Sequence, residues 1–205
     1  MKNLLLKLRG RALILASASP RRKQLLEGLD LPFSIEYNGN ISEDYHPETD
    51  PYLVPLHLSE LKSAGFLRNL DDSEILITAD TLVFCNGAIL GKPSGRDNAI
   101  DILKMLSGNM HEVITGVTLR SNRLTKSFTS VTKVYFRNLT VEEITYYIDE
   151  YAPYDKAGAY GAQEWIGYMA IEKIEGSFFN VMGLPVQRLY QELNEFIADK
   201  GSSTS

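Results

Sequence analysis

Short continuous runs of apolar residues alternate along the chain with segments whose apolar residues recur at helical spacing. The runs at 12–16 and 75–79 predict two buried strands, and the second of them ends at Asp80. A helix is predicted after the first run, because Ser19 offers an N-cap side chain and Pro20 suits the first helical position. The same reasoning predicts further helices at about 56–69, from a Ser94 capping box to Gly108, after a Thr140 capping box, and at 186–197, and further strands at 32–37, 111–120, 127–137 and 168–174.

These elements predict the fold class. Residues 82–90 favour a hairpin, because Asn86-Gly87 accepts the positive φ angles of a tight turn. Helices and strands alternate without a strict βαβ rhythm, which indicates a mixed α/β protein around one large twisted sheet. The length of 205 residues fits one domain or two small lobes that share a core. We expect a single domain over residues 1–200 and a disordered tail at 201–205, where the residues are small and polar.

Composition narrows the class of protein. With 44% hydrophobic and 23% charged residues, a disordered chain is excluded. The single cysteine excludes an intrachain disulfide and a zinc site made of several thiolates, and it favours the cytoplasm. No apolar run approaches the ~18 residues of a membrane-spanning helix, so no membrane partner is expected. The net charge of −5 argues against a stable nucleic-acid complex.

The distribution of charge points to an anion. All seven charged side chains in residues 1–26 are basic: Lys2, Lys7, Arg9, Arg11, Arg21, Arg22 and Lys23. Ser17, Arg21 and Arg22 surround the start of the predicted helix, where free N–H groups and the helix dipole favour an anion. The alternative is a capped surface helix with solvated arginines.

Three later positions offer further chemistry. Asp80, at the end of a buried strand, suits a general base or a metal ligand, and its alternative is a turn-capping residue. Lys92 is held between Gly91 and Pro93, where it contacts either phosphate or solvent. Gln163 carries a donor and an acceptor able to read a base edge, although a Gly/Ala-rich strand end without function explains the same run. His46, His57 and His111 lack metal-ligand spacing and are expected at the surface or half buried.

Taken together, the motifs resemble the Maf (septum-formation) family of nucleoside triphosphate pyrophosphatases. Six segments carry the resemblance in family order: 15–22 (LASASPRR), 78–81 (TADT), 91–93 (GKP), 106–108 (LSG), 155–163 (DKAGAYGAQ) and 180–185 (NVMGLP). The resemblance spans residues 13–197. It implies an elongated fold, similar to that of inosine triphosphatases, with a long twisted mixed sheet flanked by helices and two lobes around a cleft.

The resemblance also implies an activity, which is hydrolysis of a nucleoside triphosphate to the monophosphate and pyrophosphate with Mg²⁺ or Mn²⁺. Family members are commonly homodimers. The dTTP/UTP branch carries residues that match Arg21, Thr81 and Gln163 here, whereas the 7-methyl-GTP branch usually has Glu in place of Gln163. A pyrimidine triphosphate is therefore the expected substrate. Ala162 replaces a larger apolar residue common in the family, which would loosen the base pocket.

Roles for the remaining residues also follow from the resemblance. Asp80 is the expected base and metal ligand, Glu43 the second metal or water-positioning carboxylate, and Lys62 and Lys92 the phosphate contacts. The family acid near position 43 usually follows an Asp, but here Ser42 precedes Glu43, so Asp44 is the alternative carboxylate. The rival functions are a pyrophosphatase for 7-methyl-GTP or other altered nucleotides and a non-catalytic nucleotide-binding regulator of cell division.

Overall fold

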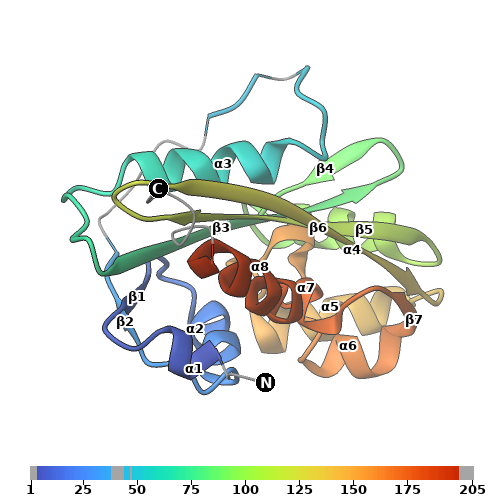
Figure 1. Ribbon diagram of the computed structural model, residues 1–205. Coiled ribbons are helices and arrows are strands. Elements are labelled where there is room, and N and C mark those ends of the chain that lie inside the picture. Colours follow the sequence, from blue (N-terminus) through green and yellow to red (C-terminus); the bar gives the residue numbers. More distant parts are fainter. Residues whose placement is uncertain (1–3, 38–43, 47, 199–205) are drawn as a thin grey trace. The chain divides into compact units, whose positions relative to one another are not determined.

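The computed structural model describes residues 4–37, 44–46 and 48–198 (Figure 1). The chain divides into two compact units. The first unit comprises Met1–Asp80, Thr115–Ser130 and Gly183–Ser205, and the second comprises Thr81–Ile114 and Val131–Met182. The predicted tail at 201–205 lies outside the described residues. The single domain of two lobes, the elongated shape and the cleft stay predictions.

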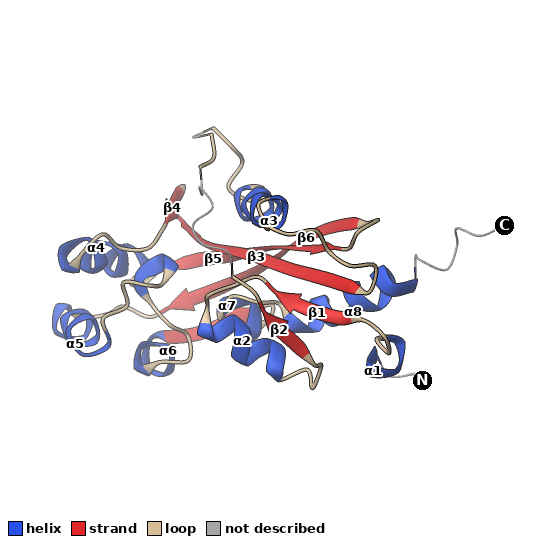
Figure 2. Ribbon diagram, turned by 90° about the vertical axis from the view of Figure 1, so that its left-hand side faces the viewer, coloured by secondary structure: helices blue, strands red, loops and turns tan. Residues whose placement is uncertain are grey.

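The described residues form one seven-stranded sheet with the order β2-β1-β3-β5-β6-β7, and β4 pairs with β3 outside this path (Figure 2). Its strands are β1 (Ala12–Leu15), β2 (Phe33–Ile35), β3 (Glu74–Cys85), β4 (Ala88–Leu90), β5 (Met110–Arg120), β6 (Thr125–Phe136) and β7 (Ile171–Glu175). Strand β1 pairs in parallel with β2 and β3, with Leu13 opposite Phe33 and Ile75. The pairs β3·β4 and β6·β7 are antiparallel. The sheet is therefore mixed, which confirms the predicted fold class.

Helices precede, connect and follow the strands. They are α1 (Leu4–Lys7), α2 (Pro20–Glu27), α3 (Val54–Ala64), α4 (Arg96–Leu106), α5 (Val141–Tyr151), the 3-10 turn η1 (Ala157–Ala159), α6 (Trp165–Ala170), α7 (Phe178–Val181) and α8 (Val186–Ala198). Ser19 caps α2, and the predicted capping box of Thr140 and Glu143 caps α5. The predicted Ser94 capping box is wrong. Helix α4 begins after Gly95, and the side chain of Asn98 accepts a hydrogen bond from the Ser94 N–H at 3.1 Å.

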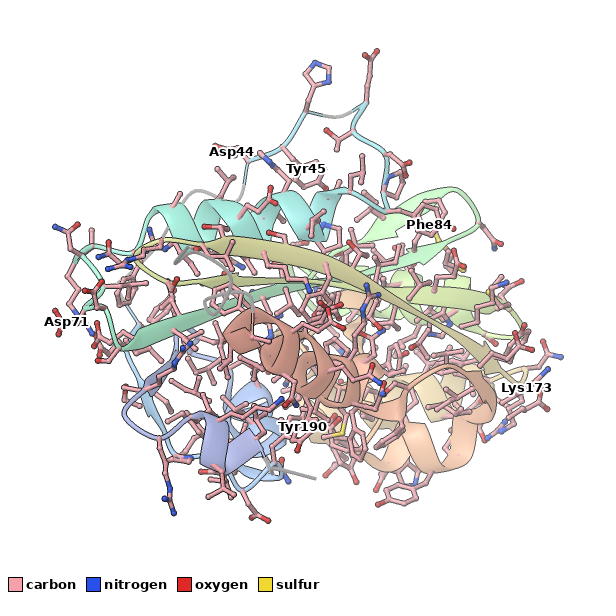
Figure 3. The ribbon with its side chains drawn as sticks, viewed as in Figure 1. Asp44, Tyr45, Asp71, Phe84, Lys173 and Tyr190 are labelled. Atoms are coloured by element: carbon pink, nitrogen blue, oxygen red, sulfur yellow. The ribbon has the colours of Figure 1, made fainter. Side chains whose placement is uncertain are left out.

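Strand β3 is longer than the apolar run predicts. It continues to Cys85, so Asp80 and Thr81 lie within the strand and not at its end; Phe84, labelled in Figure 3, belongs to this later part. The two polar residues are only partly exposed, between the buried Ala79 and Leu82. The strand thus continues through two polar positions into the apolar residues 82–85, of which 83–85 pair with β4.

The hairpin after β3 is confirmed, because Asn86 and Gly87 have φ angles of 49° and 82°. The predicted strand at 168–174 is wrong in its first half, since residues 165–170 form α6 and only 171–175 form β7. Gly167 explains the helical turn. A Cβ at this position would lie 1.9 Å from the Ala162 carbonyl oxygen, so only glycine lets α6 pack so closely on the preceding segment.

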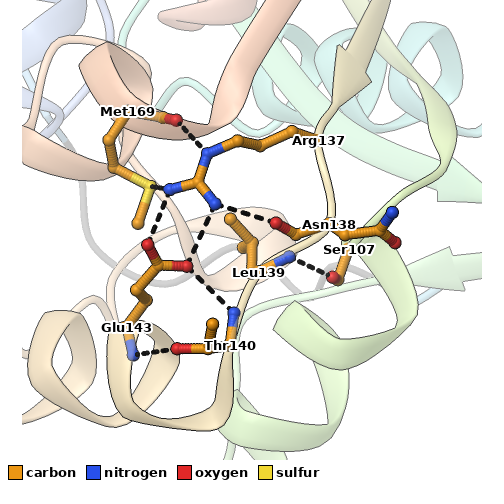
Figure 4. Close-up of polar contacts among 7 residues, drawn as sticks. All are labelled: Ser107, Arg137, Asn138, Leu139, Thr140, Glu143 and Met169. Atoms are coloured by element: carbon orange, nitrogen blue, oxygen red, sulfur yellow. Dashed lines mark hydrogen bonds and ion pairs between the residues drawn. The ribbon is translucent and has the colours of Figure 1, made fainter.

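A cluster centred on Arg137 joins three elements of the second unit (Figure 4). Its Nε donates to the Met169 carbonyl at 2.6 Å, at the end of α6, and its two NH groups reach the Glu143 carboxylate at 2.8 and 3.1 Å. The guanidinium holds the pKa of the Glu143 carboxyl below its usual range. Glu143 also accepts the Thr140 N–H at 2.9 Å, so the same carboxylate caps α5 and fixes the end of β6.

Candidate active site

The start of α2 lies in the first unit, directly after β1. The buried Ser17 accepts a hydrogen bond from the Ser19 N–H at 3.2 Å, and the Ser19 hydroxyl accepts the Arg22 N–H at 3.4 Å. These two bonds fold the four residues between β1 and α2 into a defined turn. They place the Ser17 side chain at the positive end of the helix dipole, as the sequence predicts.

Arg22 differs from a solvated surface arginine. Its Nε donates to the Gly183 carbonyl at 2.9 Å, which ties α2 to the segment that precedes α8. Both Arg21 and Arg22 are half buried. One edge of the Arg22 guanidinium is therefore committed to the fold, which orients the side chain.

Lys62 and Asp80 are in direct contact. The Lys62 ammonium, on the last turn of α3, forms a hydrogen-bonded ion pair with Asp80 Oδ1 on β3. Their side chains are 19% and 13% exposed, so solvent reaches both groups but does not surround them. Partial burial makes the pair stronger than a surface ion pair and leaves it open to a ligand.

Three hydroxyl side chains hold α3 where this contact forms. Thr78 Oγ1 donates to the Ser59 carbonyl at 2.7 Å, and the Ser59 and Thr118 hydroxyl oxygens lie 2.8 Å apart in a hydrogen bond. Ser59, Thr78 and Thr118 are fully buried. Since Ser59 and Lys62 are three residues apart, they share one face of the helix. The bonds that fix Ser59 on the sheet therefore also aim Lys62 at β3.

Gly116 on β5 lets the first turn of α3 approach the sheet. A Cβ at this position would lie 2.3 Å from the Pro55 carbonyl group and 2.4 Å from the Leu56 nitrogen. These are backbone atoms, which cannot move aside as the tip of a side chain can. The position of α3 on the sheet, and with it the position of Lys62, therefore depends on glycine at position 116.

The expected metal site is described only in part. Asp80 is present, whereas Glu43 lies outside the described residues. Asp44, its alternative, is exposed on the loop that precedes α3, beside Tyr45 (Figure 3). In the described part of the chain, no three His, Cys, Asp or Glu side chains gather as a protein-only metal site would require. The donor set still suits a hard cation, because Mg²⁺ is commonly held by one or two carboxylates together with substrate phosphates.

The other predicted site residues belong to the second unit. Thr81 is partly buried on β3, directly after Asp80, and Lys92 is exposed on the loop after β4. That loop is tied to η1, because the Gly158 N–H donates to the Gly91 carbonyl at 3.1 Å. Gly158 itself has a φ of 70° and would crowd Val83 if it carried a Cβ. Glycine at 158 thus brings the Lys92 loop and the 155–163 segment together.

Gln163 has an unsatisfied side-chain acceptor. Its amide oxygen is buried and makes no hydrogen bond within the described residues. A buried acceptor without a donor costs free energy, on the order of 1–3 kcal/mol. A ligand or an ordered water can supply the missing donor.

The sequence reasoning missed a polar network beside Gln163. Lys156 is 8% exposed, and its ammonium lies 2.7 Å from Asp155 and 3.0 Å from Glu164. The Tyr147 hydroxyl donates to Glu164 and accepts the Gly161 N–H at 3.0 Å. Lys156 belongs to the motif 155–163, and a lysine within that Gly/Ala-rich run was a signal that could have pointed to this network. Tyr147 gave none, because it lies on the apolar face of α5.

His111 corrects the expectation for the histidines. It is fully buried, Nε2 is 2.8 Å from the Tyr160 hydroxyl, and its ring meets those of Phe136 and Tyr160 edge-on. Burial lowers the pKa of His111 to about 3. Burial also raises the pKa of Tyr160, so both groups stay neutral near pH 7. The contact fastens the 155–163 segment to β5.

His111 should make the protein sensitive to acid. The folded state keeps this ring neutral down to about pH 3, whereas an unfolded chain protonates it near pH 6.5. The free energy of unfolding should therefore fall as the pH drops from 6.5 toward 3, by up to ~1.4 kcal/mol per pH unit from this group. We expect His111→Gln, which keeps a hydrogen bond to Tyr160, to flatten this dependence. Urea unfolding at pH 7.5, 5.5 and 4.5 measures it, and parallel pH curves for the two proteins would contradict the assignment.

The structure brings the predicted site residues into two groups. Ser17, Arg21, Arg22, Lys62 and Asp80 belong to the first unit, and Lys62 and Asp80 are in contact there. Thr81, Lys92 and Gln163 belong to the second. Asp80 and Thr81 are consecutive in β3, so this strand carries a member of each group.

A mixed sheet, a capped helix start with two arginines, and a lysine–carboxylate pair between α3 and β3 define an α/β protein with side chains suited to a phosphorylated ligand. The comparison with protein families gives the particular group. The sequence profile described as Maf-like protein matches residues 12–196, so the chain belongs to the Maf family.

Similar proteins of known name agree with this placement. The dTTP/UTP pyrophosphatase of Porphyromonas gingivalis is 50% identical over 186 residues, covering 90% of this chain and 94% of that protein. Proteins of the same name from Parabacteroides distasonis and Flavobacterium johnsoniae are 47% and 45% identical, over 90% and 93% of this chain and 95% and 98% of those proteins. A HAM1 protein from Coxiella burnetii gives a TM-score of 0.46 at 11% identity, over 90% of this chain and 99% of that one.

Proposed function

We propose that the protein hydrolyses dTTP and UTP to the nucleoside monophosphate and pyrophosphate. Membership of the Maf family and relatives up to 50% identical that bear the name dTTP/UTP pyrophosphatase support this activity. The structural observation that supports the choice of base is the buried amide oxygen of Gln163, which makes no hydrogen bond to any residue that the structure describes. An acceptor that lacks a donor complements the N3–H of uracil and thymine, which cytosine does not offer.

The residues of the first unit suit the phosphate chemistry. Asp80 orients a water molecule and takes its proton as the water attacks the α-phosphorus. The bond between the α-phosphorus and the bridging oxygen breaks, and pyrophosphate leaves with that oxygen. Lys62, Arg21 and Arg22 offset the charge of the triphosphate, and Ser17 donates a hydrogen bond to it. Lys62 already contacts Asp80, so one ammonium serves both the base and the phosphate.

In the second unit, Lys92 is a further phosphate contact, and Thr81 and Gln163 read the base. The half-buried position of Thr81 next to Asp80 supports this role. A polar reader left unpaired by a wrong base imposes a penalty on that substrate. Apart from Lys92, the phosphate-handling residues and the base readers therefore lie on different stretches of the chain.

A divalent cation, Mg²⁺ or Mn²⁺, is part of the proposal. Asp80 and Glu43 are the carboxylates that would hold it, with Asp44 as the alternative to Glu43. When bound, such an ion neutralises charge on the phosphate oxygens and helps to orient them. The oxygen-only donor set of Asp80 and a triphosphate suits these hard cations.

The proposal also includes a cytoplasmic homodimer without a stable nucleic-acid complex. The resemblance supports the dimer, and sedimentation velocity tests it. The free, buried Cys85 fits a reducing compartment. Among the residues that the structure describes, none of the helices is both long and apolar enough to cross a bilayer.

The test is pyrophosphate release from dTTP, UTP, CTP, dATP, GTP and 7-methyl-GTP, with Mg²⁺, with Mn²⁺ and with a chelator. Metal-dependent release from dTTP and UTP is the expected result. Release from 7-methyl-GTP alone would keep the reaction and overturn the choice of base. Nucleotide binding without release would favour a regulator over an enzyme.

Gln163→Glu should weaken the preference for dTTP and UTP. The substitution keeps the size of the side chain and an acceptor for the base N3–H, but it removes the N–H donors that would pair with the O4 or O2 of uracil and thymine. It also adds a negative charge that repels those carbonyl oxygens. We expect kcat/KM for UTP to fall about 10–100-fold, while purine triphosphates change much less. Steady-state kinetics over the nucleotide panel measures this, and an unchanged substrate profile would refute the role of Gln163.

A further inference from the structure

We propose that Tyr147, Lys156 and Glu164 are positioning residues that set base selectivity by holding the backbone on both sides of Gln163. The inference rests on the proposed function and deepens it. None of the three is expected to touch the substrate. They act through the segment from 156 to 164, whose two ends they join.

The contacts link Lys156 to Glu164, Glu164 to Tyr147, and Tyr147 to the backbone of Gly161. The Glu164 carboxylate accepts a hydrogen bond from the Tyr147 hydroxyl on Oε2 and forms an ion pair with the Lys156 ammonium through Oε1, the latter at 3.0 Å. The Tyr147 oxygen in turn accepts the Gly161 N–H at 3.0 Å. Lys156 therefore connects with Glu164 across the loop, and Tyr147 connects Glu164 with the loop's middle. The contacts of one carboxylate and one hydroxyl thus link both ends and the middle of the nine-residue segment 156–164.

Burial makes these contacts obligatory. Tyr147 is fully buried, and the side chains of Lys156 and Glu164 are 9% and 21% exposed. A buried ammonium is tolerated only beside carboxylates, and Asp155 and Glu164 supply two. Burial, together with the Glu164 carboxylate, raises the pKa of Tyr147, so its hydroxyl keeps its proton. Breaking one contact leaves a buried polar group unpaired.

Close packing fixes the residues on either side of Gln163. A Cβ at Gly161 would lie 2.7 Å from the Glu164 carboxylate carbon, so Glu164 folds back directly over position 161. The Ala162 carbonyl sits against Gly167 of α6 in the same manner. The backbone at 161, 162 and 164 is therefore immobilised by neighbours. Gln163 differs from these neighbours, because its amide oxygen has no hydrogen-bond partner among the described residues.

This arrangement is what a base reader requires. A side chain that reads by hydrogen bonds rejects a wrong base only if it cannot turn to another partner or to water. A rigid backbone with an unpartnered tip keeps the acceptor in one place and leaves it unpaired when the base has no donor. Loosening the frame would let Gln163 satisfy itself and would remove the penalty on wrong bases.

Tyr147→Phe is the direct test, because it removes the hydroxyl and keeps the buried ring. We expect the ratio of kcat/KM for UTP to that for CTP to fall about tenfold, through a higher KM for UTP and with kcat nearly unchanged. Tyr151→Phe is the matched control. Tyr151 stacks on Tyr147 from the same helix but is 39% exposed, and this change should leave the ratio as it is.

A double-mutant cycle separates positioning from general loss of structure. In a Gln163→Ala background the reader is gone, so Tyr147→Phe should not change the UTP/CTP ratio further. UMP and CMP binding by calorimetry gives a second readout of the same ratio. Should Tyr147→Phe not fold, Glu164→Gln replaces it, with the same expected loss of selectivity.

The outcomes are distinct. A wild-type protein that treats UTP and CTP alike overturns the proposed base choice and this inference with it. A selective wild type together with an equally selective Tyr147→Phe overturns the inference alone. The inference alone is also overturned if Tyr147→Phe lowers the UTP/CTP ratio by the same factor in the Gln163→Ala background as in the wild type.

Discussion

Asp80→Asn should lower the turnover of dTTP roughly 10²–10⁴-fold, the range expected when a general base is lost. The amide keeps the shape of the carboxylate and a partner for Lys62, because its oxygen still accepts from the ammonium. It cannot take a proton from water, and it is a poorer ligand for a hard cation. Initial rates of pyrophosphate release measure the effect, and thermal unfolding shows that the variant is folded.

Asp72→Asn is the matched control for this change. Asp72 lies in the same unit, and its carboxylate is 3.6 Å from Arg123 in an ion pair whose side chains are 69% and 75% exposed. An exposed pair of this kind contributes little, so the control should retain full activity. Turnover by Asp80→Asn within a factor of three of the wild type would remove Asp80 from the role of base.

Gly116→Ala should reduce both stability and activity. The new methyl group would meet the backbone of Pro55 and Leu56 at 2.3–2.4 Å, so α3 must move away from the sheet. Overpacking of this kind lowers the free energy of unfolding by about 1–3 kcal/mol. A shift of α3 also withdraws Lys62 from Asp80, and a displacement of about 1 Å can cost roughly 10²-fold in rate.

Gly91→Ala provides the comparison for stability. Position 91 is exposed, and a Cβ there would meet nothing within 4 Å. Its free energy of unfolding should stay within about 0.5 kcal/mol of the wild-type value. Urea unfolding of both variants tests the pair. If Gly116→Ala is as stable as Gly91→Ala, the close approach of α3 to β5 is not what seats the helix.

Local signals in the sequence predicted the elements that local chemistry decides. Ser19 and Thr140 cap helices as expected, since a cap involves residues three apart. The hairpin at Asn86-Gly87 is confirmed as well, because a tight turn also depends only on residues close together in the sequence. Strand β3 was predicted too short, because the polar Asp80 and Thr81 interrupt its apolar run, which resumes at 82–85 where the strand pairs with β4.

The contacts of the candidate site depend on residues far apart in the chain. Nothing near Lys62 indicates that it meets Asp80, because that meeting depends on Gly116 and on the buried hydroxyls of Thr78 and Thr118. The individual site residues are predicted from their motifs, and their roles stay predictions. The Tyr147–Glu164–Lys156 network escaped, since a tyrosine on an apolar helix face looks like a packing residue.

The boundary between the two units passes between Asp80 and Thr81. Under the proposed roles, the residue that carries the reaction ends one unit and a residue that reads the base begins the next. Except for Lys92, the phosphate-handling side chains are encoded outside 81–114 and 131–182. A library of variants mutated only within 81–114 and 131–182 could therefore change the choice of base and leave the residues that carry the reaction unchanged. Such a separation would let related proteins diverge in the nucleotide they remove without evolving the reaction again.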